Sequence, residues 1–248
     1  MTPFASFGMY PFEALRPAWE QLWEAVHSRA SWTPAALTWD GTVHDHWVDP
    51  ACAVSHVCGW PVATRLRSTV AVVGAFTLAL PEAQGHRYRS MFVASRSGAL
   101  ASFVTADTTL AANSDDSLSG WVSLQAATVG SGRPWPGRIH WTGAHVDSVR
   151  SVRAGEADLA SIDELTWAHV RRLEPGLVDD LHIVGRGPWI PSPAIVTSTG
   201  RVDELRRAFV EAMTDPATRP ARAALLLTGF VALEDAEYEA IPRELGHG

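Results

Sequence analysis

Short apolar runs alternate with amphipathic helical patterns along the whole chain, and this alternation constrains the fold more than any other feature. The run 52–57 is apolar enough to form a buried strand. Before it, Trp19, Leu22 and Val26 recur at the spacing of one helix face, which indicates a helix over 15–26. Strands that alternate with helices are typical of a mostly parallel sheet covered on both faces. The sequence therefore predicts an α/β fold.

The charge balance excludes several functions. The chain has 248 residues, with 27 acidic residues against 20 that are Lys or Arg, and a formal net charge of -7. Binding to nucleic acid normally needs a basic surface, so we expect no nucleic-acid partner. All the Lys-or-Arg positions are Arg, which excludes chemistry that needs a lysine, such as a Schiff base or a P-loop.

Cysteine spacing and hydropathy bear on the compartment. Cys52 and Cys58 match no zinc motif, and their redox state stays open. No apolar run approaches the roughly 20 residues of a membrane span, so we expect no membrane insertion. The first residues lack the charged and apolar regions of a secretory signal. The sequence as written thus predicts a cytoplasmic protein, or a periplasmic one if a signal has been removed.

The stretch 112–121 joins an expected strand to an expected helix over 118–129, and it is rich in hydroxyl groups. The first turn of a helix leaves backbone N–H groups unpaired and carries partial positive charge. Ser117, Ser119 and Gly120 lie at that point, which suits an oxyanion. Serine is also a preferred N-cap residue, so a purely structural cap is the alternative.

Two further stretches lie at the ends of expected strands. His145 starts an expected helix, where it could donate to the same anion or serve as an exposed or capping residue. Ser55 and Trp60 lie at the end of the run 52–57, and Trp60 also fits a core position. Ligands of open α/β sheets bind outside the carboxyl ends of the strands, so the agreement of three stretches favours a binding site.

Metal and catalytic motifs are weak. The segment His44-Asp45-His46 offers two imidazoles, but no HExxH helix or cysteine cluster accompanies it, which favours a solvated helix over a metal site. A GxSxG elbow and a dinucleotide fingerprint are both missing. We therefore expect no metal and no cofactor. Ser, His and Asp are plentiful, and whether any three meet as in a hydrolase stays open.

Six segments together resemble the phosphate-, phosphite- and phosphonate-binding proteins of ABC importers. They are residues 9–10, 55–61, 88–90, 117–120, 143–148 and 154–163. The resemblance covers most of the chain and implies a type II periplasmic-binding-protein fold, with two Rossmann-like lobes joined by two crossing strands. With the order of elements, it predicts one lobe from residues 1–86 plus 196–248 and an inserted lobe from residues 87–195.

The resemblance also implies a function. It implies a solute-binding protein that holds a small oxyanion (a phosphonate, phosphite or phosphate) between the lobes, with an ABC permease as a partner and without catalysis. It places these residues at the ligand: Tyr10, Ser55, Trp60, Tyr88, Ser117, Ser119, Gly120, His145 and Asp163. Asp163 lies where the family can meet an amino group of the ligand. The alternative is an enzyme of thiamin-pyrimidine-like metabolism on the same fold. We expect a monomer.

Overall fold

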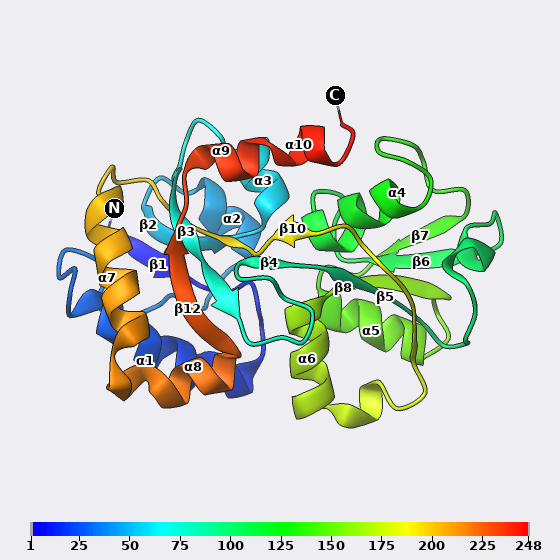
Figure 1. The fold of residues 1–248 in the computed structure, drawn as a ribbon, viewed down its shortest axis with the longest axis horizontal. Coiled ribbons are helices and arrows are strands. Elements are labelled where there is room, and N and C mark those ends of the chain that lie inside the picture. The colour runs from blue at the N-terminus through cyan, green and yellow to red at the C-terminus, as the bar shows by residue number, and fades with distance from the viewer. Residues whose placement is uncertain (1, 248) are drawn as a thin grey trace. The chain divides into compact units, whose positions relative to one another are not determined.

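The computed structural model describes residues 2–247, which divide into two compact units (Figure 1). Unit 1 holds residues 2–87 and 191–240, and unit 2 holds residues 88–190 and 241–247. Each unit has its own five-stranded sheet with helices packed against it. The predicted α/β fold class is confirmed.

Unit 1 is built on a sheet of order β1-β2-β11-β3-β12. Its strands are β1 (Phe4–Ser6), β2 (Cys52–Val57), β3 (Ala71–Leu78), β11 (Ala194–Thr197) and β12 (Leu227–Ala232). Its helices are η1 (Glu13–Leu15), α1 (Arg16–His27), α2 (Val43–Val48), α3 (Gly59–Ala63), α7 (Val202–Thr214), η5 (Pro216–Thr218), α8 (Arg219–Leu225) and α9 (Asp235–Glu239). Helices α1, α7 and α8 pack against one another on one side of the sheet, and α2 and α3 lie on the other (Figure 1).

The core of unit 1 is aromatic. The predicted helix over 15–26 is confirmed as α1, and its Pro17 is tolerated because it lies in the first turn. Trp19 and Trp23 of α1 are buried with their rings edge-on to Phe7, which also stacks on Phe209 of α7. Large buried rings of this kind fix α1 and α7 on the sheet.

Unit 2 is built on a sheet of order β7-β6-β8-β5-β9. Its strands are β5 (Ser90–Ala94), β6 (Thr109–Ala112), β7 (Arg138–Trp141), β8 (Leu159–Asp163) and β9 (His182–Arg186). Its helices are η2 (Leu100–Phe103), η3 (Leu118–Val122), α4 (Ser123–Ala127), α5 (His145–Arg153), α6 (Glu164–Leu173), η4 (Pro175–Leu177) and α10 (Ile241–Glu244). Phe92, Phe103, Leu110, Leu124 and Leu159 form the centre of its core.

The expectation of mostly parallel sheets is wrong, because both sheets are mixed. In unit 1, β11 runs antiparallel to β2 and β3, and in unit 2, β5 runs antiparallel to β8 and β9. The first residue of β11, Ala194, pairs with Val57 at the end of β2, and Ser90 of β5 pairs with Asp163 at the end of β8. Each of these two strands follows a passage of the chain between the units. It enters its sheet at the edge where the neighbouring strand ends, and so it must run antiparallel to that strand.

The chain passes between the units three times, after Arg87, Ile190 and Ala240. The first two passages lie in β4 (Arg87–Tyr88) and β10 (Ile190–Pro191), which pair with each other. The third lies between α9 and α10, so residues 241–247, which were expected in the first lobe, group with unit 2. Leu245 is buried there, and its carbonyl accepts a hydrogen bond from the Ser131 hydroxyl.

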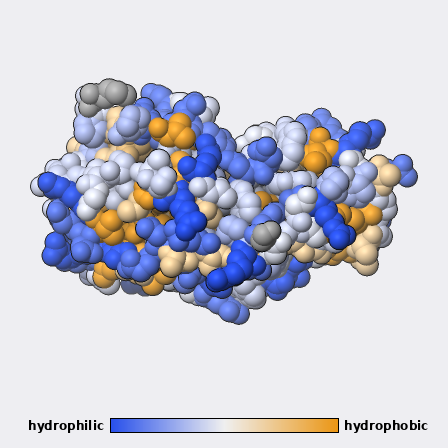
Figure 2. All heavy atoms as spheres, turned by 90° about the horizontal axis from the view of Figure 1, so that it is seen from above, coloured by the Kyte–Doolittle hydropathy of each residue, from blue (hydrophilic) through white to orange (hydrophobic). Residues whose placement is uncertain are grey.

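Figure 2 shows one face of the molecule coloured by hydropathy. The face in Figure 2 is mostly hydrophilic, and its apolar residues form small separate groups. Of residues 2–247, none belongs to a helix that has both the length and the apolar character needed to cross a membrane.

Candidate functional site

The serine-rich turn of unit 2 follows β6 and begins the helical segment η3–α4. Ser117 is the N-cap of this segment, because its Oγ accepts a hydrogen bond from the backbone N–H of Gly120 at 3.0 Å. The structural cap that the sequence left open is thus present at Ser117. A hydroxyl that accepts one hydrogen bond still has its proton to donate, so the cap leaves Ser117 able to bind an oxyanion.

The first turn of this segment is a π-turn, and it depends on two serines that the sequence analysis missed. In the π-turn, the Ser123 N–H donates to the carbonyl of Leu118 rather than to that of Ser119. The Ser119 carbonyl accepts instead from the hydroxyls of Ser90 at 2.8 Å and Ser161 at 2.5 Å. Ser90 and Ser161 both lie at fully buried strand positions, where a polar side chain needs a hydrogen-bond partner.

Two of the predicted site residues, Ser119 and Asp163, lie next to the imidazole of a third, His145. Ser119 Oγ lies 2.9 Å from His145 Nε2, and Asp163 Oδ2 lies 3.4 Å from the same nitrogen. His145 begins α5, and Asp163 ends β8 as the N-cap of α6, where its Oδ1 accepts from the Thr166 N–H at 2.8 Å. The carboxyl ends of the strands therefore bring together side chains that are far apart in the sequence.

The cluster is buried, and burial lowers the pKa of its imidazole. Only 11% of the His145 side chain and 3% of the Asp163 side chain are exposed. Burial lowers the pKa of His145 below its ordinary value, although the Asp163 carboxylate and the backbone of Ser161 both raise it. The Thr166 hydroxyl donates to Asp163 Oδ2, so the carboxylate is fixed by hydrogen bonds. Asp163 is thus the acidic member of the cluster.

This arrangement differs from a catalytic triad. In a triad, the imidazole takes the serine proton at one ring nitrogen, and the carboxylate holds the other nitrogen. Here Ser119 Oγ and Asp163 Oδ2 face the same nitrogen of His145. The geometry gives a hydrolase no support. Because Ser119 and His145 share one hydrogen bond, the pair has one further proton, on Oγ or on Nδ1, to offer a ligand.

Gly120 is required by the close approach of Asn113. A Cβ on Gly120 would lie 1.8 Å from Asn113 Oδ1 and 3.0 Å from Ser117 Oγ. We expect Gly120→Ala to lower the free energy of unfolding by about 1–3 kcal/mol, because the Asn113 amide must leave its place. Chemical denaturation measures this loss.

A double variant provides the control for this prediction. Asn113→Ala removes the atoms that a Cβ on residue 120 would meet, so Gly120→Ala in the Asn113→Ala background should cost less than it does alone. Equal costs in the two backgrounds would contradict the contact.

The predicted residues of unit 1 lie around the end of β2. Tyr10 is buried, with its ring 5.8 Å from the ring of His56, and Trp60 is half-buried in α3. The Ser55 hydroxyl donates to the Ser6 carbonyl at 3.1 Å. Its proton is used inside the sheet, so it has only acceptor capacity for a ligand, which does not suit an anion. Tyr88 of β4 belongs to unit 2 and is buried.

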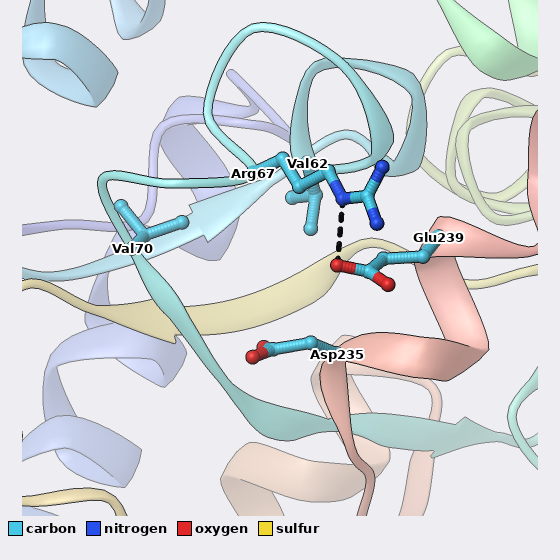
Figure 3. Close-up of a pocket in the computed structure, with 5 residues that line it drawn as sticks. All are labelled: Val62, Arg67, Val70, Asp235 and Glu239. Atoms are coloured by element: carbon cyan, nitrogen blue, oxygen red, sulfur yellow. Dashed lines mark hydrogen bonds and ion pairs between the residues drawn. The ribbon is translucent and has the colours of Figure 1, made fainter.

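A small hollow in unit 1 offers no comparable site. Val62, Arg67, Val70, Asp235 and Glu239 line it, and its volume of about 10 Å³ suits a single water molecule (Figure 3). Arg67 Nε donates to Glu239 Oε1 at 2.7 Å, and Asp235 Oδ1 accepts from the Val72 N–H at 2.7 Å. The polar groups of the hollow are thus committed to each other and to the fold.

The histidines of α2 are engaged in local contacts. His46 Nδ1 lies 2.7 Å from Ser6 Oγ, and His44 Nδ1 lies 3.1 Å from an Arg65 nitrogen. Within residues 2–247, no three His, Cys, Asp or Glu side chains gather closely enough to hold a metal ion. Cys52 and Cys58 are both buried, and neither forms a disulfide within the described residues.

A comparison with family models identifies the family of this chain. The family model for the periplasmic substrate-binding protein of ABC phosphonate transporters matches residues 62–238. No curated protein sequence matches the chain.

Solved structures give the same picture of the fold. A binding-protein component of an ABC phosphonate transporter from Pseudomonas aeruginosa is 15% identical, with a TM-score of 0.76 over 99% of this chain and 86% of that one. The PhnD1 protein of Prochlorococcus marinus in complex with methylphosphonate is 11% identical, with a TM-score of 0.77 over 99% and 97% of the two chains. A Xanthomonas citri protein bound to chloride ion is 14% identical, with a TM-score of 0.71 over 99% of each chain.

Two α/β units with mixed sheets, similar to those of these neighbours, give the chain the type II periplasmic-binding-protein fold. The chain belongs to the family of periplasmic substrate-binding proteins of ABC phosphonate transporters. The resemblance predicted from the sequence is confirmed, and neither the family nor the neighbours support the alternative of an enzyme.

Proposed function

We propose that the chain binds a phosphonate, or a closely related phosphorus oxyanion, at the Ser119–His145 pair, and that it serves an ABC permease in the periplasm. The observation that carries this proposal is the 2.9 Å contact between Ser119 Oγ and His145 Nε2, next to the serine turn. Family membership supports the ligand class and the permease as a partner. The neighbour with methylphosphonate supports that compound as the first probe.

The chemistry of the pair suits this ligand. The Ser117 and Ser119 hydroxyls and the His145 imidazole are short, buried hydrogen-bonding groups from two helix starts. Donors of this kind bind an oxyanion without lysine, of which the chain has none. We leave Ser55 out of the proposed ligand contacts because its proton is used by Ser6. Tyr10, Trp60 and Tyr88 remain proposed pocket residues.

Ser119→Ala tests the proposal. A hydrogen bond to a charged group contributes about 1.5–3 kcal/mol, so the variant should bind methylphosphonate about ten- to a hundredfold more weakly. Isothermal titration calorimetry measures the change. The free energy of unfolding should fall by only about 1–3 kcal/mol, because the variant loses the buried contact with His145 but keeps the helix cap at Ser117.

Ser114→Ala is the matched control. The Ser114 hydroxyl lies three residues before the cap and donates to Asp116 Oδ1 at 2.7 Å, so its loss should leave the affinity unchanged. Equal affinities for Ser119→Ala and the wild type would remove Ser119 from the site. A wild-type protein that binds no phosphonate, phosphite or phosphate would overturn the proposed function itself.

A further inference from the structure

The cluster of Ser119, His145 and Asp163 has an unusual charge balance for an anion site. It contains one buried carboxylate and one imidazole whose pKa is lowered by burial, so the cluster has no fixed positive charge to set against its carboxylate. An incoming oxyanion adds further negative charge within a few ångströms of Asp163. Like charges in a buried site disfavour each other strongly unless a proton is added or the ligand carries a positive group of its own, and methylphosphonate carries none.

The described residues of unit 2 (88–190 and 241–247) bring no arginine into contact with this cluster. Helix α5, which carries His145, packs against β5, β6, β8, α6 and η4. Of these, β5, β6 and η4 have no titratable side chain, and β8 has only Asp163. Helix α6 adds Glu164, His169, Arg171 and Arg172, and α5 itself adds Asp147, Arg150 and Arg153.

The arginines on these helices are engaged elsewhere or lie far along their helix. Arg150 pairs with Asp147 at 2.8 Å, and Arg153 pairs with Asp180 at 2.9 Å. Arg171 and Arg172 lie in the last turn of α6, whereas Asp163 caps its first turn.

The charged residues beside the neighbouring strands do not compensate for the carboxylate either. Arg89, directly before β5, donates from Nε to the Gly187 carbonyl at 2.8 Å and lies over the Trp189 ring. Before η3, Asp116 accepts from Ser114. Among the described residues of unit 2, the contacts of the Asp163 carboxylate are therefore its hydrogen-bond donors in Thr166 and the imidazole nitrogen of His145.

We propose that Asp163 makes the uptake of one proton part of oxyanion binding, so that the site prefers an oxyanion that arrives with a proton over a fully ionised one. The proton comes from the solvent. It adds to the imidazole, which then has an N–H at both nitrogens, or it stays on a ligand oxygen that donates to Asp163 Oδ2. In both cases the complex holds one proton more than the free protein and the dianion together, and no bond to phosphorus changes.

This inference rests on the proposed function, and calorimetry distinguishes the two. Methylphosphonate is titrated into the protein at several pH values above the second ionisation of the ligand, in two buffers of different ionisation enthalpy. We expect an uptake of about one proton for each ligand bound and an affinity that falls about tenfold per pH unit. No binding at any pH would remove the proposed function. Binding without proton uptake would remove only the inference.

Asp163→Asn is the decisive variant, because asparagine caps a helix as well as aspartate does. Without the carboxylate, proton uptake should fall toward zero and the affinity should become nearly independent of pH. Asp158→Asn is the control: Asp158 lies just before the opposite end of β8, where its Oδ2 accepts from the Thr109 N–H at 2.8 Å. It should keep the proton uptake of the wild type. If Asp163→Asn keeps it too, then Asp163 is only a helix cap.

Discussion

Acidification from pH 6.5 to pH 3 should lower the free energy of unfolding of unit 1 by about 4–5 kcal/mol, because His56 must stay neutral in the folded state. Burial lowers its pKa to about 3, and a hydrogen bond with the backbone of Pro193 offsets only part of that effect. The imidazole lies among the rings of Phe7, Trp19 and Phe76, with centroids 5.7 Å away, so a charge there would lose its hydration.

The sign of this dependence follows from the lowered pKa. The unfolded chain takes up a proton below pH 6.5, whereas the folded protein does so only near pH 3. The contribution of His56 is complete above pH 6.5, shrinks as the pH falls and levels off near pH 3. In unit 2, burial and Arg172 lower the pKa of His169 to about 4. The pH range over which His169 affects the free energy of unfolding is therefore narrower than that of His56.

Urea denaturation at a series of pH values measures this effect. His56→Leu removes the titrating group and should flatten the acid slope of unit 1, whatever its stability at pH 7. His140→Leu, on the exposed β7, is the matched control and should leave the slope unchanged. An unaltered slope in His56→Leu would show that other groups cause the acid sensitivity.

Gly74→Ala should destabilise unit 1 by about 3 kcal/mol, because the centre of β3 has no room for a side chain. A Cβ at this position would lie 2.1 Å from the backbone oxygen of Val231 and 2.6 Å from the Phe230 ring. A backbone atom of the neighbouring strand cannot rotate away, so β3 and β12 must separate locally. The Phe230 ring also stacks on Phe209, which spreads the disturbance to α7.

Thermal and urea denaturation measure this loss, with Gly176→Ala as the control. A Cβ on Gly176 meets nothing within 4 Å, so the control should change the stability by less than about 0.5 kcal/mol. Equal stabilities of the two variants would contradict the packing of β3 against β12.

The fold class was predictable because it depends on local patterns, whereas strand direction depends on chain path. The spacing of Trp19 and Leu22 is enough to identify α1. The antiparallel insertion of β5 and β11 has no local signature, since it arises where the chain enters a sheet after changing unit. The same reason explains residues 241–247, whose place depends on contacts with the loop that contains Ser131.

The candidate site was predictable in its members but not in its geometry. Helix starts and strand ends indicate Ser119 and His145, and the family resemblance adds Asp163. No pattern in the sequence specifies a π-turn, so the carbonyl that it frees at Ser119 could not be predicted. The serines that fill this gap, Ser90 and Ser161, are consequently visible only in the structure.

The third passage of the chain between the units, after Ala240, determines where two labels can be attached to detect a hinge motion. Residues 2–87 lie in unit 1 and residues 241–247 lie in unit 2, so the described stretch begins and ends in different units. A donor fluorophore attached near residue 2 and an acceptor attached near residue 247 would therefore each follow a separate unit, without any label inside a sheet. Energy transfer between them would report a hinge motion on addition of ligand, so the chain already carries the attachment points of an optical biosensor.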